Sequence, residues 1–147
     1  MRQRILPSVL IAGLLATAGL PLLAQPNESP APPGREVVTP SGLKYVDLKI
    51  GVGEAAAEGK ILEVSYWGKL AANGVRFESS MEDHPFTFRL GAGDAIKGWD
   101  EGLLGMKVGG KRRLVIPPEL GFGKQGVGSV VPPNAVLVYE LELLAVR

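Results

Sequence analysis

From Glu36 onward, the chain consists of short apolar runs that are interrupted every few residues by glycine, proline or Asn-Gly. These residues end helices and mark turns, so a long helix does not fit between them. Several runs alternate apolar and polar residues, which is the period of a half-buried β-strand. The pattern therefore predicts a sheet of short strands, and a hydrophobic content of 46% suits a globular protein.

The positions of the strands follow from this pattern. We expect strands within residues 43–50, 61–70, 75–79, 86–90, 112–117 and 135–146. Asn73-Gly74 supplies a hairpin turn, because both residues tolerate the positive φ of tight hairpins. One helix is expected within 95–104, where Ile96, Trp99 and Leu103 fall on one face. The predicted fold class is α+β, a mainly antiparallel sheet packed on one short helix without long crossovers.

The first 24 residues have a different character. Residues 5–24 carry no charge and are rich in Leu, Ile and Ala, and they follow Arg2 and Arg4. A basic start, an apolar run and small residues are typical of a secretory signal peptide. The run is also long enough for a membrane anchor, but three residues interrupt it: Gly13, Gly19 and Pro21. We favour a signal at 1–24; cleavage after Ala24 and earlier cleavage both stay open.

A proline-rich segment follows the expected signal. Residues 25–34 contain four prolines and little that can be buried, so we assign 25–38 to an extended linker and 39–147 to one domain. The signal predicts an exported protein, with a bacterial periplasm as the first choice and secretion or an organelle lumen as alternatives. The chain has no Cys, so neither a disulfide nor a lipidated cysteine is available.

Charge and composition exclude several classes of function. Without residues 1–24, the chain has 14 basic and 15 acidic residues, which gives no electrostatic footprint for nucleic acid. We interpret its one basic run, Lys111-Arg112-Arg113, as solvated charge. His84 is the only histidine, which argues against an ordinary zinc site, and no nucleophile elbow or phosphate loop occurs. We expect no metal, no cofactor, no nucleic acid and no membrane contact after cleavage.

Aromatic residues are distributed over most of the predicted elements. They include Tyr66, Trp67, Phe77, Phe86, Phe88, Trp99, Phe122 and Tyr139. Composition alone favours placing them in the core, and we expect Phe88 and Trp67 there. The alternative is that several of them line a concave face beside the apolar residues Ile96, Val130 and Val131.

Seven motifs in a fixed order decide between these alternatives. They are VSYWG at 64–68, RFESS at 76–80, PFTFRLG at 85–91, IKGWDEGL at 96–103, GGKR at 109–112, IPPE at 116–119 and VPPNAVLVY at 131–139. In this order and spacing the chain resembles the FKBP-type peptidyl-prolyl isomerases over about 39–147. The resemblance implies a five-stranded antiparallel sheet curled around a short helix, with a hydrophobic pocket between them that isomerises X-Pro bonds.

The resemblance also implies roles for individual residues. Trp99 forms the pocket floor, and Ile96 adds an apolar wall and a backbone N–H for a substrate carbonyl. Glu78 stands where the family usually has aspartate, and Phe122 where it commonly has tyrosine. The residues assigned to catalysis are Tyr66, Phe77, Glu78, Phe86, Ile96, Trp99, Phe122 and Tyr139, and those assigned to substrate binding are Ala95, Val130 and Val131.

This assignment fits the physics of bond rotation. The barrier of roughly 18–20 kcal/mol arises from amide resonance, and no group has to be protonated or attacked. The twisted amide is less polar than the planar one, so a dry apolar pocket favours it. We expect a monomer that acts on proline-containing polypeptides and binds macrolide inhibitors. The alternative, motivated by Glu78 and Phe122, is a chaperone or proline-peptide binding module with little isomerase activity.

Overall fold

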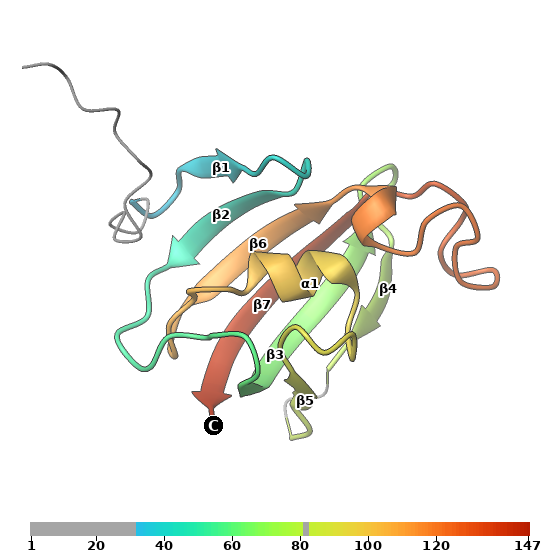
Figure 1. The fold of residues 1–147 in the computed structure, drawn as a ribbon. Helices are drawn as coiled ribbons and strands as arrows, with labels where there is room; N and C mark the ends of the chain where they lie inside the picture. Colours follow the sequence, from blue (N-terminus) through green and yellow to red (C-terminus); the bar gives the residue numbers. More distant parts are fainter. Residues whose placement is uncertain (1–31, 81–82) are drawn as a thin grey trace, which may run out of the picture. The chain divides into compact units, whose positions relative to one another are not determined.

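In a computed structural model of the protein, residues 32–80 and 83–147 are described (Figure 1). They form one sheet of seven strands, one α-helix and one 3-10 turn: β1 (Glu36–Val38), β2 (Lys44–Lys49), β3 (Ile61–Leu70), β4 (Arg76–Ser79), β5 (Phe86–Arg89), α1 (Lys97–Gly102), β6 (Lys111–Ile116), η1 (Pro118–Leu120) and β7 (Leu137–Val146). The expected signal at 1–24 lies outside the described residues. Within those residues, no helix has the length and apolarity that crossing a membrane requires.

The sheet is antiparallel throughout, which confirms the predicted fold class. Its strands lie in the order β1-β2-β6-β7-β3-β4, and β5 also pairs with β3. The long strand β3 pairs with β7 along one edge, and its other edge is divided between β5 and β4. In Figure 1, α1 crosses one face of this curved sheet.

Seven strands are present, where the sequence pattern predicted six and the resemblance implied five. One reason is that the outer edge of β3 takes two short strands: β5 pairs with Ile61–Val64, and β4 pairs with Trp67–Lys69. The other is that Glu36–Val38 pairs with Lys44–Val46 as β1. The last three residues of the expected linker 25–38 therefore form β1.

The core lies between the sheet and α1. Along β7, Leu137, Tyr139, Leu141 and Leu143 are buried, as the alternation in the sequence predicts. Leu62 and Val64 of β3 face the same core. Phe88 is also buried, as expected.

Two glycines allow α1 to approach the sheet closely. A Cβ at Gly98 would lie 2.7 Å from Ile116, and one at Gly102 would lie 2.8 Å from Leu114. Residues four apart share a helix face, so these glycines give α1 one smooth side. The side chain of Trp99, next in sequence to Gly98, is buried between helix and sheet.

Arg112 is buried, which corrects our interpretation of the basic run as solvated charge. Its Nε donates to Asp47 Oδ1 at 2.7 Å, and its Nη1 donates to the Gly102 carbonyl at 2.8 Å. The alternation of β6 explains this: Lys111 and Arg113 are exposed, whereas Arg112 points inward. A guanidinium at a helix C-terminus binds a carbonyl that the helix leaves free. Arg112 therefore connects β6 to both the neighbouring strand β2 and the end of α1.

Candidate active site

A cleft of about 420 Å³ opens beside α1. It receives residues from β3, β4, β5 and β7, from α1 and the segment before it, and from the loop after η1. The lining residues are Tyr66, Glu78, Phe86, Gly93, Asp94, Ala95, Ile96, Trp99, Phe122 and Tyr139. Except for two carboxylates, two phenol hydroxyls and the indole N–H of Trp99, their side chains are apolar.

Trp99 is the centre of a packed group of aromatic rings. Its ring lies 4.7 Å from that of Tyr66, 5.2 Å from that of Tyr139 and 5.9 Å from that of Phe86, centre to centre. All three pairs are edge-to-face, with interplanar angles of 78° to 89°. This is the favoured geometry for aromatic pairs, so Trp99 is held in place from several sides.

The one direct hydrogen bond between lining side chains joins Tyr139 to Glu78, among the residues that the structure describes. The Tyr139 hydroxyl donates to a Glu78 carboxylate oxygen. Burial, and then the bond to Glu78, raise the pKa of Tyr139 above its ordinary value. Burial, and secondarily the Glu78 charge, also raise the pKa of Tyr66. Both phenols are therefore protonated at neutral pH.

Ile96 provides a backbone donor at the edge of the cleft. It is the N-cap of α1, with extended backbone angles. Its carbonyl accepts the N–H groups of Trp99 and Asp100. Its own N–H makes no backbone hydrogen bond within the described part of the chain. A ligand carbonyl could accept this bond.

The structure brings eight of the eleven assigned residues to the cleft: Tyr66, Glu78, Phe86, Ala95, Ile96, Trp99, Phe122 and Tyr139. Phe77 instead packs edge-on against Tyr139, at 5.8 Å between ring centres. Val131 is only 2% exposed and belongs to the core, whereas Val130 is 50% exposed. The backbones of Val127 and Val131 pair and close a tight turn. In this turn the side chain of Val131 points into the core, whereas that of Val130 points to solvent.

Gly93 and Asp94 line the cleft without having been assigned to it. The turn-forming stretch Gly91-Ala92-Gly93-Asp94 directly precedes Ala95 and Ile96, both of which were assigned. Sequence proximity to Ala95 and Ile96 was therefore the signal that could have identified Gly93 and Asp94 as lining residues. The Asp94 carboxylate accepts the backbone N–H of Arg89 at 3.1 Å, which closes the turn.

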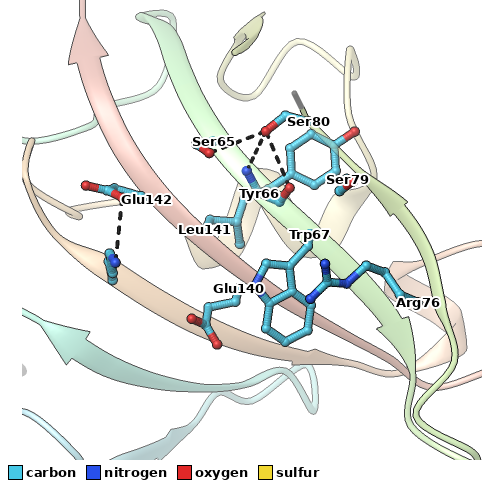
Figure 2. Close-up of a pocket in the computed structure, with 10 residues that line it drawn as sticks. Ser65, Tyr66, Trp67, Arg76, Ser79, Ser80, Glu140, Leu141 and Glu142 are labelled. Atoms are coloured by element: carbon cyan, nitrogen blue, oxygen red, sulfur yellow. Dashed lines mark hydrogen bonds and ion pairs between the residues drawn. The ribbon is translucent and has the colours of Figure 1, made fainter. Parts of the chain in front are cut away.

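A second concavity of about 280 Å³ includes Ser65, Trp67, Ser79, Ser80 and Glu140 in its lining. Figure 2 shows the Arg76 guanidinium beside the Trp67 ring, 4.9 Å from its centre. Trp67 is therefore not in the core, because it alternates along β3 with the inward-facing Tyr66. Charged and hydroxyl groups dominate this lining, so it does not offer the dry surface that a twisted amide favours.

Comparison with known proteins identifies the family. A family model described as FKBP-type peptidyl-prolyl cis-trans isomerase matches residues 52–144. This chain belongs to that family. The predicted enzyme class is thereby confirmed, and the cleft over Trp99 lies within the matched FKBP domain.

Relatives and solved structures agree with this assignment. The chain is 52% identical over 106 residues to an FK506-binding protein of Neisseria meningitidis serogroup B, covering 71% of this chain and 96% of that protein. It is 48% identical over 118 residues to FK506-binding protein 4 of Dictyostelium discoideum, covering 80% of this chain but only 32% of that protein.

Among solved structures, AtFKBP13 aligns with a TM-score of 0.71 and 39% identity, over 77% of this chain and 99% of that one. FkpA from Escherichia coli aligns with a TM-score of 0.69 and 42% identity, over 76% of this chain and 51% of that one. The FKBP domain therefore matches a complete small relative and also parts of longer ones.

Proposed function

We propose that this FKBP domain accelerates X-Pro rotation by binding the proline ring over Trp99 and the twisted amide in the aromatic cleft. The observation that carries the proposal is the group of edge-to-face rings around Trp99. Apolar contact contributes roughly 25 cal/mol per Å² of surface removed from water. The less polar twisted amide gains more from such surroundings than the planar amide does.

The Ile96 N–H supports a fixed orientation of the substrate. Because it lacks a backbone partner among the described residues, it is available to the carbonyl of a bound peptide. This bond would hold the chain next to proline while the prolyl bond rotates over Trp99. The Tyr139 hydroxyl donates a hydrogen bond to Glu78. Glu78 therefore has a hydrogen-bond donor within the cleft itself.

We further propose that the protein is exported, acts as a monomer and assists folding outside the cytoplasm, with a bacterial periplasm as its location. The uncharged run at 5–24 supports export, and the Neisseria relative is bacterial. X-Pro isomerisation unaided takes tens to hundreds of seconds, slow enough to limit folding. Residues 25–35 would then be a linker before the sheet.

The chain without residues 1–24 is expected to accelerate a refolding reaction that is limited by proline isomerisation. The rate should rise in proportion to the concentration of added protein, because each encounter lowers the same rotational barrier. The measurement is refolding fluorescence with and without the protein. If micromolar protein binds proline peptides but leaves the refolding rate unchanged, the binding-module alternative holds instead.

Phe122→Tyr is expected to tighten binding of FK506, the ligand named for the Neisseria relative, about two- to tenfold. Phe122 lines the cleft without a hydroxyl, and one added hydrogen bond contributes about 0.5–1.5 kcal/mol. Titration calorimetry measures the change. Phe122→Leu, which adds no donor, serves as the control and should not gain affinity; equal affinities for Phe122→Tyr and the unmodified protein would contradict the prediction.

A further inference from the structure

The face of the sheet that is turned away from the core carries two cationic side chains beside one indole ring. The Lys69 ammonium lies 5.7 Å and the Arg76 guanidinium 4.9 Å from the centre of the Trp67 ring. Lys69 on β3 and Arg76 on β4 are register partners, so both side chains extend from the same face. Both distances are within the range of a cation–π contact, which holds each charge beside the ring.

Neither of these two cations has an acidic partner among the residues that the structure describes. The other cations near Trp67 are paired on the same face: Lys111 with Glu142 at 3.8 Å, and Arg113 with Glu140 at 3.4 Å. No ion pair within 4.0 Å includes either cation beside the Trp67 ring. Like charges directly opposite each other on two strands destabilise a sheet. An anion that binds between them would remove this repulsion.

The polar concavity beside Trp67 adds hydroxyl groups to these charges. Ser65, Ser79 and Ser80 line it together with Arg76. Ser79 is exposed and is the register partner of Trp67, so it stands on the same face of β4 as Arg76. A guanidinium with a neighbouring hydroxyl is a suitable set of donors for a carboxylate.

The strand that carries Arg76 and Ser79 lies at an edge of the sheet. β4 pairs with β3, and no strand formed by described residues lies beyond it. An edge strand leaves some of its backbone N–H and C=O groups without a partner strand, and an extended polypeptide can pair with them. Figure 2 shows Arg76 extending from this strand over the Trp67 ring. The cations therefore lie where an added strand would run.

We propose that Trp67, Lys69 and Arg76 form a docking site for an acidic, extended segment of a partner polypeptide, separate from the cleft. A carboxylate of the segment would accept hydrogen bonds from the guanidinium, which the indole holds in place, and would lie near the Lys69 ammonium. A single acidic side chain can reach these two cations alone. A uniformly anionic membrane would also meet Glu140 and Glu142 on this face and be repelled by them.

The test uses the full-length chain and a proline-free peptide in which Glu alternates with Thr, with Gln and Lys versions for comparison. Fluorescence anisotropy of the labelled peptides gives Kd. At low salt we expect the Glu peptide to bind about tenfold or more tightly than the Gln peptide, and the Lys peptide not to bind. In 1 M NaCl this advantage should fall several-fold, because the Debye length shrinks to about 3 Å. Equal binding of the Glu and Gln peptides at low salt would overturn the inference.

The two tryptophans of the chain show where the peptide binds. The Glu peptide should shift the NMR signal of the Trp67 indole N–H and leave that of Trp99, which lines the cleft, unchanged. Trp67→Phe assigns the two signals. A shift of the Trp99 signal alone would mean that the peptide occupies the cleft, and this result would overturn the inference.

Variants separate a defined site from general attraction to positive charge. Arg76→Gln should weaken binding of the Glu peptide about tenfold and Lys69→Gln about threefold, and Trp67→Leu should weaken it although no charge is lost. Circular dichroism verifies that each variant is folded.

Lys44→Gln is the matched control, because Lys44 is an exposed cation in the same row of the sheet, three strands away on β2. It should leave binding nearly unchanged. Equal losses for Lys44→Gln and Arg76→Gln would overturn the inference, as would binding to phosphatidylglycerol vesicles without binding to the Glu peptide.

Discussion

Trp99→Ala is expected to lower kcat/KM for a proline peptide about ten- to thirtyfold. The substitution removes the apolar floor of the cleft, and losing roughly 60–80 Å² of contact with the proline ring costs about 1.5–2 kcal/mol in the transition state. The same change leaves a cavity among the Tyr66, Phe86 and Tyr139 rings. Unfolding free energy should therefore fall as well, by about 3–5 kcal/mol.

Phe88→Ala separates the two effects. Phe88 is buried and lies 5.7 Å from the Trp99 ring, but it does not line the cleft. It should lose comparable stability while retaining most of its activity per folded molecule, measured by kinetics and circular dichroism at low temperature. If Trp99→Ala does not fold, Trp99→Leu keeps part of the volume and should show the same order of activities. Equal kcat/KM for the two alanine variants would mean that Trp99 is only a core residue.

Arg112→Ala is expected to destabilise the protein by about 3–5 kcal/mol. The substitution leaves Asp47, which is 5% exposed, as a buried charge without its partner. It also removes the donor to the Gly102 carbonyl at the end of α1. Urea unfolding measures the change in free energy.

The neighbouring arginine provides a matched control. The Arg113 side chain is 46% exposed and pairs with Glu140 at 3.4 Å, so Arg113→Ala should cost at most about 1 kcal/mol. Replacing both partners, Arg112→Met with Asp47→Leu, should recover most of the stability, since two charges no longer need to be buried. Equal losses for the two single arginine variants would contradict the role given to Arg112.

Local patterns predicted most of the fold. The alternation in β3 and β7 and the apolar face of α1 are properties of neighbouring residues, and each was placed to within a few residues. Glu36–Val38 was missed because only Val37 is partly buried, so its strand depends on a partner that local periodicity does not reveal. Arg112 was misinterpreted for a related reason: its partners, Asp47 and Gly102, are brought to it only by the folded sheet.

The resemblance predicted the position of the cleft correctly, but it did not predict every residue that lines the cleft. Aromatic residues on regular elements, such as Tyr66 and Trp99, have orientations that the strand and helix periods determine. Val130 and Val131 lie in a long loop where no period applies, and their opposite exposures follow from one backbone pairing. The Tyr139–Glu78 bond joins residues 61 positions apart, which a list of motifs does not convey.

The place of β7 has a consequence for how the protein is made. It is the last strand in the sequence, yet it lies between β6 and β3 in the middle of the sheet (Figure 1). A nascent chain that lacks it has only two separate halves, β1-β2-β6 on one side and β3-β4-β5 on the other. Strand pairing over such long sequence separations is slow. The cleft, which takes Tyr139 from β7, therefore assembles only after β7 has been synthesised and has paired with β3 and β6.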